Sequence, residues 1–403
     1  MTTLTRKGRL ALKTQGAWGT AETSFSATDY MDVNAPFVPP MKRESQRADV
    51  FRPGLGHAPI TLPGSKVPTD IQVSGDLHGW STSTPSGNPS AFPDALLLGR
   101  ALGGESTPTG YTTQLASGAS TSAFKYTDGQ GSTGWNGFAQ NVPISGGRAI
   151  GWLAAVDTTT NPDTGTLEAA ITAAHSSSGV MYGSHVVYNH DTDNDPTPLT
   201  LQWLGTAAAD QLLYFDVAVR SYTLTLESKK APMFAATLAA LDWTQSGSGG
   251  APADYAYGYP KVPVWTGTNG ARAYLNGTAR CYQRVVITIE NTLDEGPCHS
   301  STQGVSQWYV SERAITIETI RLITDTSAIT AVAGDTPGLL QIDLATTPGR
   351  SVSVMANVQV REQPEPIAIG NLVGERVLYD VIPYSGDTGS NGPANRALKI
   401  AFM

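Results

Sequence analysis

Residues 351–361 read SVSVMANVQVR and alternate apolar and polar side chains except at Met355. The valines and Ala356 fall on one face, and the serines, Asn357, Gln359 and Arg361 fall on the other. This period of two residues is typical of a β-strand that buries one face. The same period recurs in residues 69–77, 283–291, 313–320 and 339–345, and one strand is expected at each end of the chain, in residues 6–13 and 396–403. The sequence therefore predicts a mainly β fold.

Helical patterns are few. Residues 90–102 read SAFPDALLLGRAL, with Ser90 as a capping residue, Pro93 in the first turn and two glycines directly after Leu102. These are the usual signals for the start and the end of a helix. Residues 166–175 form a second, weaker helical pattern. We expect one or two short helices that cover a sheet, joined by long loops.

The low charge of the chain is its most unusual compositional feature. Only 15% of the 403 residues are charged, and 42 glycines and 26 prolines supply many turns. A soluble monomer of this size usually carries about a quarter of charged residues, so we expect other copies of the chain to cover much of its surface. No apolar run is long enough for a membrane helix, and the N-terminus lacks the pattern of a secretory signal.

The charge is also unevenly distributed. Residues 1–60 carry eight basic and five acidic residues, whereas the remainder carries 18 basic and 29 acidic residues. Four of the basic residues, Lys42, Arg43, Arg47 and Arg52, lie in a proline-rich stretch, residues 30–56. Proline lacks a backbone donor, so we expect this stretch to be a long extended arm and not a strand pair. A basic arm on an acidic body favours contact between copies over nucleic-acid binding.

A weak internal repeat suggests two halves. Residues 66–80 (KVPTDIQVSGDLHGW) and 229–243 (KKAPMFAATLAALDW) share lysine, proline, a strand, leucine and tryptophan in the same order. The interpretation is a duplicated barrel, with halves at 1–215 and 216–403. The first half includes the arm, 30–56, and an insertion at 104–200.

Motifs for catalysis or metal binding are lacking. Asp191, Asp193 and Asp195 have the first spacings of a calcium loop, but Pro196 and Gln202 occupy positions that need glycine and glutamate. The six histidines have no metal-site spacing and are interpreted as surface or partly packed residues. Cys281 and Cys298 are expected to be reduced, with Cys281 in the core. We therefore assign no catalytic residue, no cofactor and no metal, and expect that the protein is not an enzyme.

The order of several segments resembles the tail tube protein of bacteriophages with long, non-contractile tails. The segments that carry this resemblance are GAWGTAET (16–23), KRESQRADVFRPGLG (42–56), KVPTDIQVSGDLHGW (66–80), PDALLLGRALGG (93–104), YTLTLESKKAPMFAATLAALDW (222–243), RCYQRVVITIEN (280–291), GERVLYDVIPYSG (374–386) and RALKIAFM (396–403). Each motif is loose, and their order carries the likeness. Residues 104–215 and much of 244–275 are not covered, and we expect insertions there on the outside of a tube.

The resemblance implies a β-barrel or sandwich subunit that assembles into rings, which stack into a hollow tube. Its partners would be other copies, a tape-measure protein and tail terminator or tip proteins, with DNA passing through transiently. The location would be the virion tail, assembled in the host cytoplasm. The repeat favours a ring of three chains with pseudo-sixfold symmetry, and six chains are the alternative.

The resemblance also suggests which residues face the inside of the tube and which touch the next ring. Asp70, Gln72, Ser74 and Asp76 share one polar face of a strand and are the lumen candidates, with an outward solvent face as the equal alternative. Lys42, Arg43, Arg47 and Arg52 are the inter-ring candidates. A different class of function stays open as well: a secreted or virion-associated β-rich carbohydrate-binding protein or hydrolase.

Overall fold

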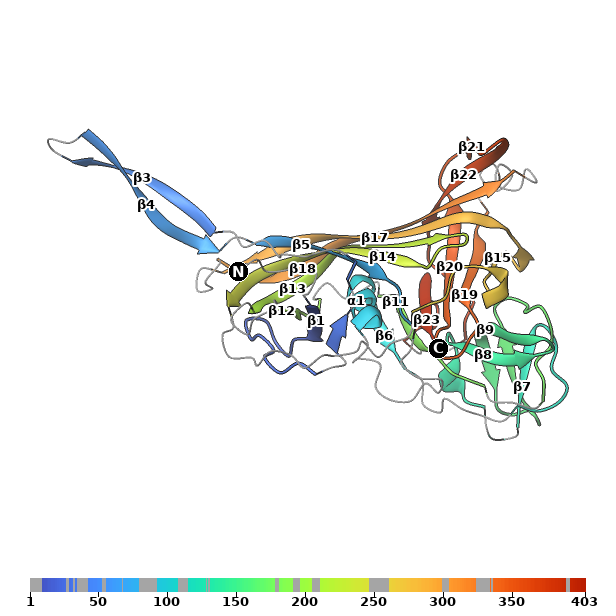
Figure 1. Cartoon of the computed structure of the whole chain (residues 1–403). Coiled ribbons are helices and arrows are strands. Elements are labelled where there is room, and N and C mark those ends of the chain that lie inside the picture. Colours follow the sequence, from blue (N-terminus) through green and yellow to red (C-terminus); the bar gives the residue numbers. More distant parts are fainter. Residues whose placement is uncertain are drawn as a thin grey trace.

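The computed structural model describes most of the chain. The described residues are 9–26, 29–31, 33–34, 43–52, 56–66, 68–79, 93–107, 115–127, 129, 131–177, 181–190, 196–204, 211–245, 261–298, 304–323, 334, 336–388 and 392–403, with the backbone alone in 9, 43–52, 56–66 and 204. The fold is mainly β, as the sequence predicts (Figure 1).

Most strands belong to one large, curled, antiparallel sheet. Its 17 strands are β1 (Arg9–Thr14), β2 (Tyr30–Met31), β5 (Thr69–Asp76), β6 (Gly103–Ser106), β11 (His185–Asn189), β12 (Leu199–Leu204), β13 (Gln211–Glu227), β14 (Met233–Gln245), β15 (Arg272–Leu275), β16 (Thr278–Ala279), β17 (Tyr282–Pro297), β18 (Val305–Leu322), β19 (Gly338–Ala345), β20 (Val352–Val360), β21 (Glu365–Ile369), β22 (Leu372–Val381) and β23 (Leu398–Phe402).

Two smaller sheets complete the described structure. A four-stranded sheet contains β7 (Ala123–Tyr126), β8 (Ala139–Ile144), β9 (Gly147–Asp157) and β10 (Asp163–Leu167), and a two-stranded ribbon contains β3 (Arg43–Arg52) and β4 (Gly56–Lys66). The helices are α1 (Pro93–Leu102) and two short 3-10 turns, η4 (Thr133–Trp135) and η5 (Gly267–Asn269). In the described part of the chain, no helix is both long and apolar enough to cross a membrane.

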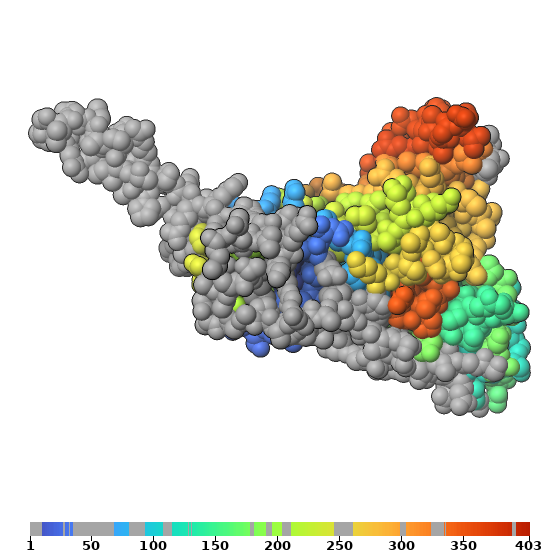
Figure 2. Space-filling view, viewed as in Figure 1, coloured from blue at the N-terminus to red at the C-terminus, as the bar shows by residue number. Residues whose placement is uncertain are grey.

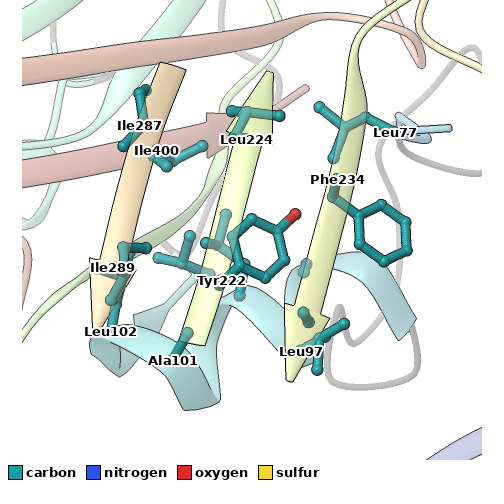
Figure 3. Packing of buried hydrophobic residues seen from close by; sticks show 14 of the residues in the cluster. Leu77, Leu97, Ala101, Leu102, Tyr222, Leu224, Phe234, Ile287, Ile289 and Ile400 are labelled. Carbon is teal, nitrogen blue, oxygen red and sulfur yellow. The ribbon is translucent and has the colours of Figure 1, made fainter. Parts of the chain in front are cut away.

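The main core lies between α1 and the concave side of the large sheet. Leu97, Ala101 and Leu102 of the helix point toward side chains of β13, β14 and β17 (Figure 3). Almost every residue of α1 is buried, so the helix fills the curl of the sheet instead of lying on its outside. The prediction of a covering helix at 90–102 is confirmed from Pro93 onward. Gly103 adopts φ +90°, a backbone conformation that favours glycine, and ends the helix there.

β20, the strand quoted first above, is buried on both faces over its first half. Ser353, predicted to face solvent, and Met355 on the same side of the strand are buried. The four-stranded sheet covers them: Trp152 of β9 donates a hydrogen bond of 3.0 Å to the Ser353 hydroxyl, and Met355 packs in one cluster with Trp152. A period of two residues predicted the strand correctly, but could not reveal this second covering layer.

The four-stranded sheet is an insertion between two strands that pair with each other. β6 and β11 are antiparallel neighbours in the large sheet, so the chain leaves after Ser106 and returns at His185. The sheet has its own core, which includes Phe124, Tyr126 and Trp135. The helix expected at 166–175 is wrong, because Thr166 and Leu167 end β10 and the residues after them form bends.

The proline-rich stretch is not simply an extended arm. β3 and β4 form an antiparallel hairpin with Arg43 opposite Lys66 and Arg52 opposite Gly56, so the expectation that no strand pair forms here is wrong. Pro53 lies between the two strands. Pro59 and Pro63 lie within β4, which is possible because each strand of a two-stranded ribbon has a free edge where no ladder donor is needed.

The two halves suggested by the repeat share one sheet. Residue 215 lies inside β13, and β5 and β14, which contain the two repeat segments, are antiparallel neighbours with Thr69 opposite Ala240. Copies related by rotation about a tube axis would place equivalent strands in the same direction. These two segments are therefore not equivalent strands of two barrels.

Cys281 and Cys298 are both free thiols, and Cys281 is exposed, not in the core as expected.

Candidate functional site

A broad, exposed sheet face is the first candidate site. Six strands lie side by side in the order β5, β14, β13, β17, β18 and β22. Their register aligns partly or fully exposed residues on one side, which we call the hydroxyl-rich face: Asp70, Gln72, Ser74 and Asp76; Met233, Ala235 and Thr237; Ser221, Thr223 and Thr225; Val286, Thr288 and Glu290; Ala314, Thr316 and Glu318; Arg376, Leu378 and Asp380.

The opposite side of the same strands forms the core around α1. Ile71, Phe234, Leu224, Ile287 and Ile317 represent five of the strands there, and each is at most 1% exposed. Successive side chains of a strand point to opposite faces, so burying this side fixes which residues face outward. The prediction that Asp70, Gln72, Ser74 and Asp76 share one exposed face of a strand is confirmed.

Ion pairs balance most of the charge on the hydroxyl-rich face. The Asp70 carboxylate lies 3.2 Å from Nε of Arg220, and the Asp76 carboxylate lies 2.7 Å from Nζ of Lys261. Arg376 pairs with Glu318 at 2.5 Å, a hydrogen bond that raises the pKa of the guanidinium. Both carboxylates among the four lumen candidates are therefore paired with a basic side chain.

The fourth ion pair of this face involves a neighbouring loop. Asp380 accepts hydrogen bonds from the guanidinium of Arg361. Exposed pairs of this kind add little to stability, but they lower the electric field that a charged molecule meets above the sheet. The result is a surface of threonine and serine hydroxyls, small apolar side chains and paired charges. Such a surface offers neither an anionic nor a cationic site of high affinity.

Apolar residues mark both ends of this sheet. At the end near Asp70, the tip of the β17–β18 hairpin packs Leu293, Trp308 and Val310 against Ala239 of β14. At the other end, Leu322, Ile323, Leu372 and Val373 are 41%, 45%, 58% and 65% exposed. These four residues lie where the end of β18 pairs with the start of β22, at the turn of the β21–β22 hairpin, which forms the orange-red lobe of Figure 2. Exposed apolar residues that lie close together are typical of a binding surface.

The β3–β4 hairpin is the second candidate site. In the described structure its strands pair only with each other, and it projects away from the large sheet beside the start of β5 (Figure 1). Of the four inter-ring candidates, Arg43, Arg47 and Arg52 lie on β3, opposite Lys66, Thr61 and Gly56. Lys42 lies outside the described residues. The backbone thus places three of the four basic residues on one projecting ribbon.

No metal-binding group occurs among the described residues, where no cluster of three or more histidine, cysteine or acidic side chains forms. Asp191, Asp193 and Asp195 lie outside this part of the chain. The histidines are less exposed than the sequence suggested. His78 is fully buried and donates its backbone N–H to Asp94 at 2.7 Å, with its Nδ1 2.9 Å from the same oxygen. His185 is 2% exposed.

Sequence reasoning missed one group of polar residues altogether. Lys399 of β23, Glu168 after β10 and Asp387 after β22 meet in the interior, with side chains at most 1% exposed. The available signal was Lys399 itself, a lone charged residue in the otherwise apolar strand LKIAF. The acidic partners lie 231 and 12 residues away in sequence, so no local pattern joins the three.

Comparison with known proteins adds no relationship. No protein-family model matches the sequence, and no curated protein matches it significantly.

Proposed function

We propose that this chain is the structural subunit of a bacteriophage tail tube. Copies of the chain would assemble into rings, and stacked rings would form a hollow conduit through which DNA leaves the virion. The hydroxyl-rich face is the observation that carries the proposal. It is six strands wide, exposed and electrically balanced, while its other side is sealed by the core.

The physical properties of this face suit the wall of a DNA channel. DNA carries a dense line of negative charge, and unpaired lysine or arginine side chains on the wall would bind it in proportion to their number. A wall of free carboxylates would repel it. The ion pairs Asp70–Arg220, Asp76–Lys261 and Glu318–Arg376 avoid both extremes. We therefore propose that Asp70, Gln72, Ser74 and Asp76 line the lumen.

Two further surfaces support self-association. The exposed apolar residues Leu322, Ile323, Leu372 and Val373 offer a contact for a neighbouring copy. The projecting β3–β4 hairpin, with Arg43, Arg47 and Arg52, would reach an adjacent ring whose body carries the acidic excess of the sequence. With most of its surface covered in this way, a chain with 15% charged residues can remain soluble as an assembly.

The proposal includes specific partners and a location. The tape-measure protein would occupy the lumen before DNA passes, and terminator and tip proteins would close the ends. The subunit would be assembled in the host cytoplasm and function in the virion. A ring contains six chains if each supplies one sheet to the wall and three if each supplies two. We propose no catalytic role.

Electron microscopy of the purified protein tests this proposal. We expect rings or tubes in negative stain and light scattering that rises with protein concentration, and end-on averages will give the ring symmetry. Monomers that persist at high concentration would contradict the proposal. Binding to a glycan array by such monomers would favour the alternative, a carbohydrate-binding protein or hydrolase.

A further inference from the structure

Three ionisable side chains from distant segments meet in the interior beside the C-terminus. Nζ of Lys399 donates hydrogen bonds to Oε1 of Glu168 and, at 2.9 Å, to Oδ2 of Asp387. The Lys399 side chain is 1% exposed, and both carboxyl groups are completely buried. Lys399 lies on β23, whose end is marked C in Figure 1, next to the four-stranded sheet. An amine and two carboxyl groups are thus held in contact, away from bulk water.

Aromatic rings close the site on two sides. Nζ of Lys399 lies 5.4 Å from the ring centre of Trp152 and 5.4 Å from that of Tyr384. The indole of Trp152 is itself held by its hydrogen bond to Ser353. These rings keep the ammonium and its partners in fixed positions and exclude solvent, which favours reactions that release water.

The carboxyl group of Asp387 is polarised at one oxygen. Oδ2 accepts hydrogen bonds from Lys399 and from the backbone N–H of Asn395, the latter at 2.9 Å. Oδ1 of Asp387 and Oε2 of Glu168 are buried and receive no hydrogen bond from a backbone N–H or a basic side chain among the described residues, and a hydrogen bond between the two carboxyl groups contributes to the raised pKa of Glu168. With Lys399 as the nucleophile, the Asn395 N–H would remain to stabilise negative charge that develops on Oδ2, as an oxyanion-hole donor does. Oδ1 of Asp387 is the oxygen that would leave as water.

Glu168 is in a suitable state to transfer a proton. Burial, with the nearby Asp387 carboxyl group, raises the pKa of Glu168 to about 8, although Lys399 opposes this shift. A carboxyl group that stays protonated near neutral pH can act as a general acid and then as a base. The two acidic residues of the cluster therefore have different roles: Asp387 carries the polarised carbonyl group, and Glu168 carries the mobile proton.

We propose that Lys399 and Asp387 form an intramolecular amide bond between Nζ and Cγ, with Glu168 as the general acid and base. This isopeptide bond would arise in the folded chain without a cofactor or a second protein. The alternative is a buried ion pair with no covalent chemistry, and the experiment below separates the two.

The reaction balances as a condensation. A proton passes from the Lys399 ammonium to Oε1 of Glu168, and Glu168 gives its own proton to Oδ1 of Asp387, which leaves a neutral amine and a neutral acid. Nζ attacks Cγ, and the negative charge forms on Oδ2, where the Asn395 N–H lies. Glu168 gives its proton to the departing Oδ1 hydroxyl and takes one from Nζ. The C–O bond breaks, the amide bond remains, one water molecule leaves and Glu168 is protonated again.

The bond would lock the C-terminal strand into the sheet. β23 has only five residues and is held by its pairing with β11 and β20. A link from Lys399 to Asp387 joins this strand covalently to the segment after β22. A short strand has few backbone hydrogen bonds of its own, so a covalent link would add to what holds it in the sheet.

Mass spectrometry of the full-length protein tests the bond directly. The folded protein is incubated, denatured and digested with a protease that cuts after glutamate. Cutting after Glu375 releases residues 376–403, which contain Asp387 and Lys399 and no glutamate. We expect this fragment to be one water molecule lighter than its sequence mass and to resist fragmentation between residues 387 and 399.

Variants distinguish the amide from other dehydrations. Lys399→Arg and Asp387→Ala should give the full mass, and Glu168→Gln should slow or abolish the loss. Asp387→Asn should release ammonia in place of water and reach the same final mass as the linked wild-type fragment. Circular dichroism shows whether each variant folds. The proposal is wrong if the fragment from folded wild-type protein has its full sequence mass, whatever the variants do. It is also wrong if folded Lys399→Arg still shows the mass loss.

Discussion

Arg321 of β18 and Glu375 of β22 stand opposite each other in the sheet register, and Nε of Arg321 lies 2.5 Å from Oε1 of Glu375. Both side chains lie on the core side of the sheet, 3% and 5% exposed. Burial acts to lower the pKa of Arg321, but Glu375 outweighs it, so the pKa of the guanidinium is raised. The pair holds β22, the last strand of the hydroxyl-rich face, in register with β18.

The first prediction concerns this pair. Glu375→Ala leaves the Arg321 charge buried without its carboxylate, and should lower the free energy of unfolding by about 3–5 kcal/mol. Arg321→Met combined with Glu375→Leu removes both charges and should restore most of this loss. Urea denaturation of the three proteins measures the difference.

The exposed pair Arg361–Asp380 is the matched control. Both side chains are at least 40% exposed, so Asp380→Ala should change stability by less than about 1 kcal/mol. Equal costs for Glu375→Ala and Asp380→Ala would show that burial does not determine the contribution of the Arg321–Glu375 pair.

Alternation alone located much of the fold. The residues of 69–77, 283–291, 313–320, 339–345 and 351–361 all fall largely within strands, and capping signals located α1. Alternation along a strand, a capping residue and a glycine that ends a helix all depend on residues that are neighbours in sequence. The sequence therefore shows them directly. The same period assigned the outward face of β5 correctly, because no second layer covers it.

Other features depend on contacts between distant residues. Ser353 and Met355 are buried only because the four-stranded sheet packs on them. The β3–β4 hairpin was missed because prolines argued against a strand, although a ribbon with two free edges tolerates them. The ion partners of Asp70 and Asp76 come from residues 150 and 185 positions away. No local pattern identifies such partners.

The second prediction is a loss of stability in acid that depends on His185. Burial lowers the pKa of His185 to about 3, so its ring is neutral in the folded protein, with Nδ1 2.9 Å from the Thr107 hydroxyl. An unfolded histidine has a pKa near 6.5, so the unfolded chain binds more protons below that pH. Stability from this residue is complete above pH 6.5 and decreases as the pH falls toward 3.

The His185→Gln variant isolates this effect. Between pH 6.5 and about pH 5, the wild type should lose about 2 kcal/mol more than the variant, measured by urea denaturation at each pH. The Glu105 carboxylate lies 3.8 Å from Nε2 of the ring, and Glu105 is present in both proteins. Glu168, whose raised pKa changes stability in the opposite direction, is also common to both. Parallel pH profiles would mean that His185 is charged in the folded state.

The third prediction concerns the projecting hairpin. Arg43 and Lys66 are register partners, so a short glycine-serine linker can replace residues 43–66. The shortened chain should keep its cooperative thermal transition, because in the described structure the hairpin pairs with no other strand. The shortened chain should no longer form stacked rings. Calorimetry and negative-stain microscopy measure the two outcomes.

A charge-reversal variant separates the shape of the hairpin from its charge. Arg43→Glu, Arg47→Glu and Arg52→Glu together keep the ribbon and reverse its basic residues. Stacking that weakens in this variant and recovers in high salt would support an electrostatic contact. Loss of the thermal transition in the shortened chain would place the hairpin in the core and contradict the prediction.

The fourth prediction tests which side of the sheet faces the lumen. Thr223, Thr288 and Thr316 are neighbours on β13, β17 and β18, and lysine at all three positions adds cations to the hydroxyl-rich face. If this face lines the tube, assembled variant tubes should bind single-stranded DNA inside and protect it from nuclease, with an affinity that falls steeply with salt.

Lysines at Thr158, Thr160 and Thr166, which are exposed on the four-stranded sheet and its loop, provide the control. DNA bound there should be digested. Equal digestion on both tubes would place the hydroxyl-rich face on the outside, because a nuclease that is too large for the lumen reaches only the outer surface.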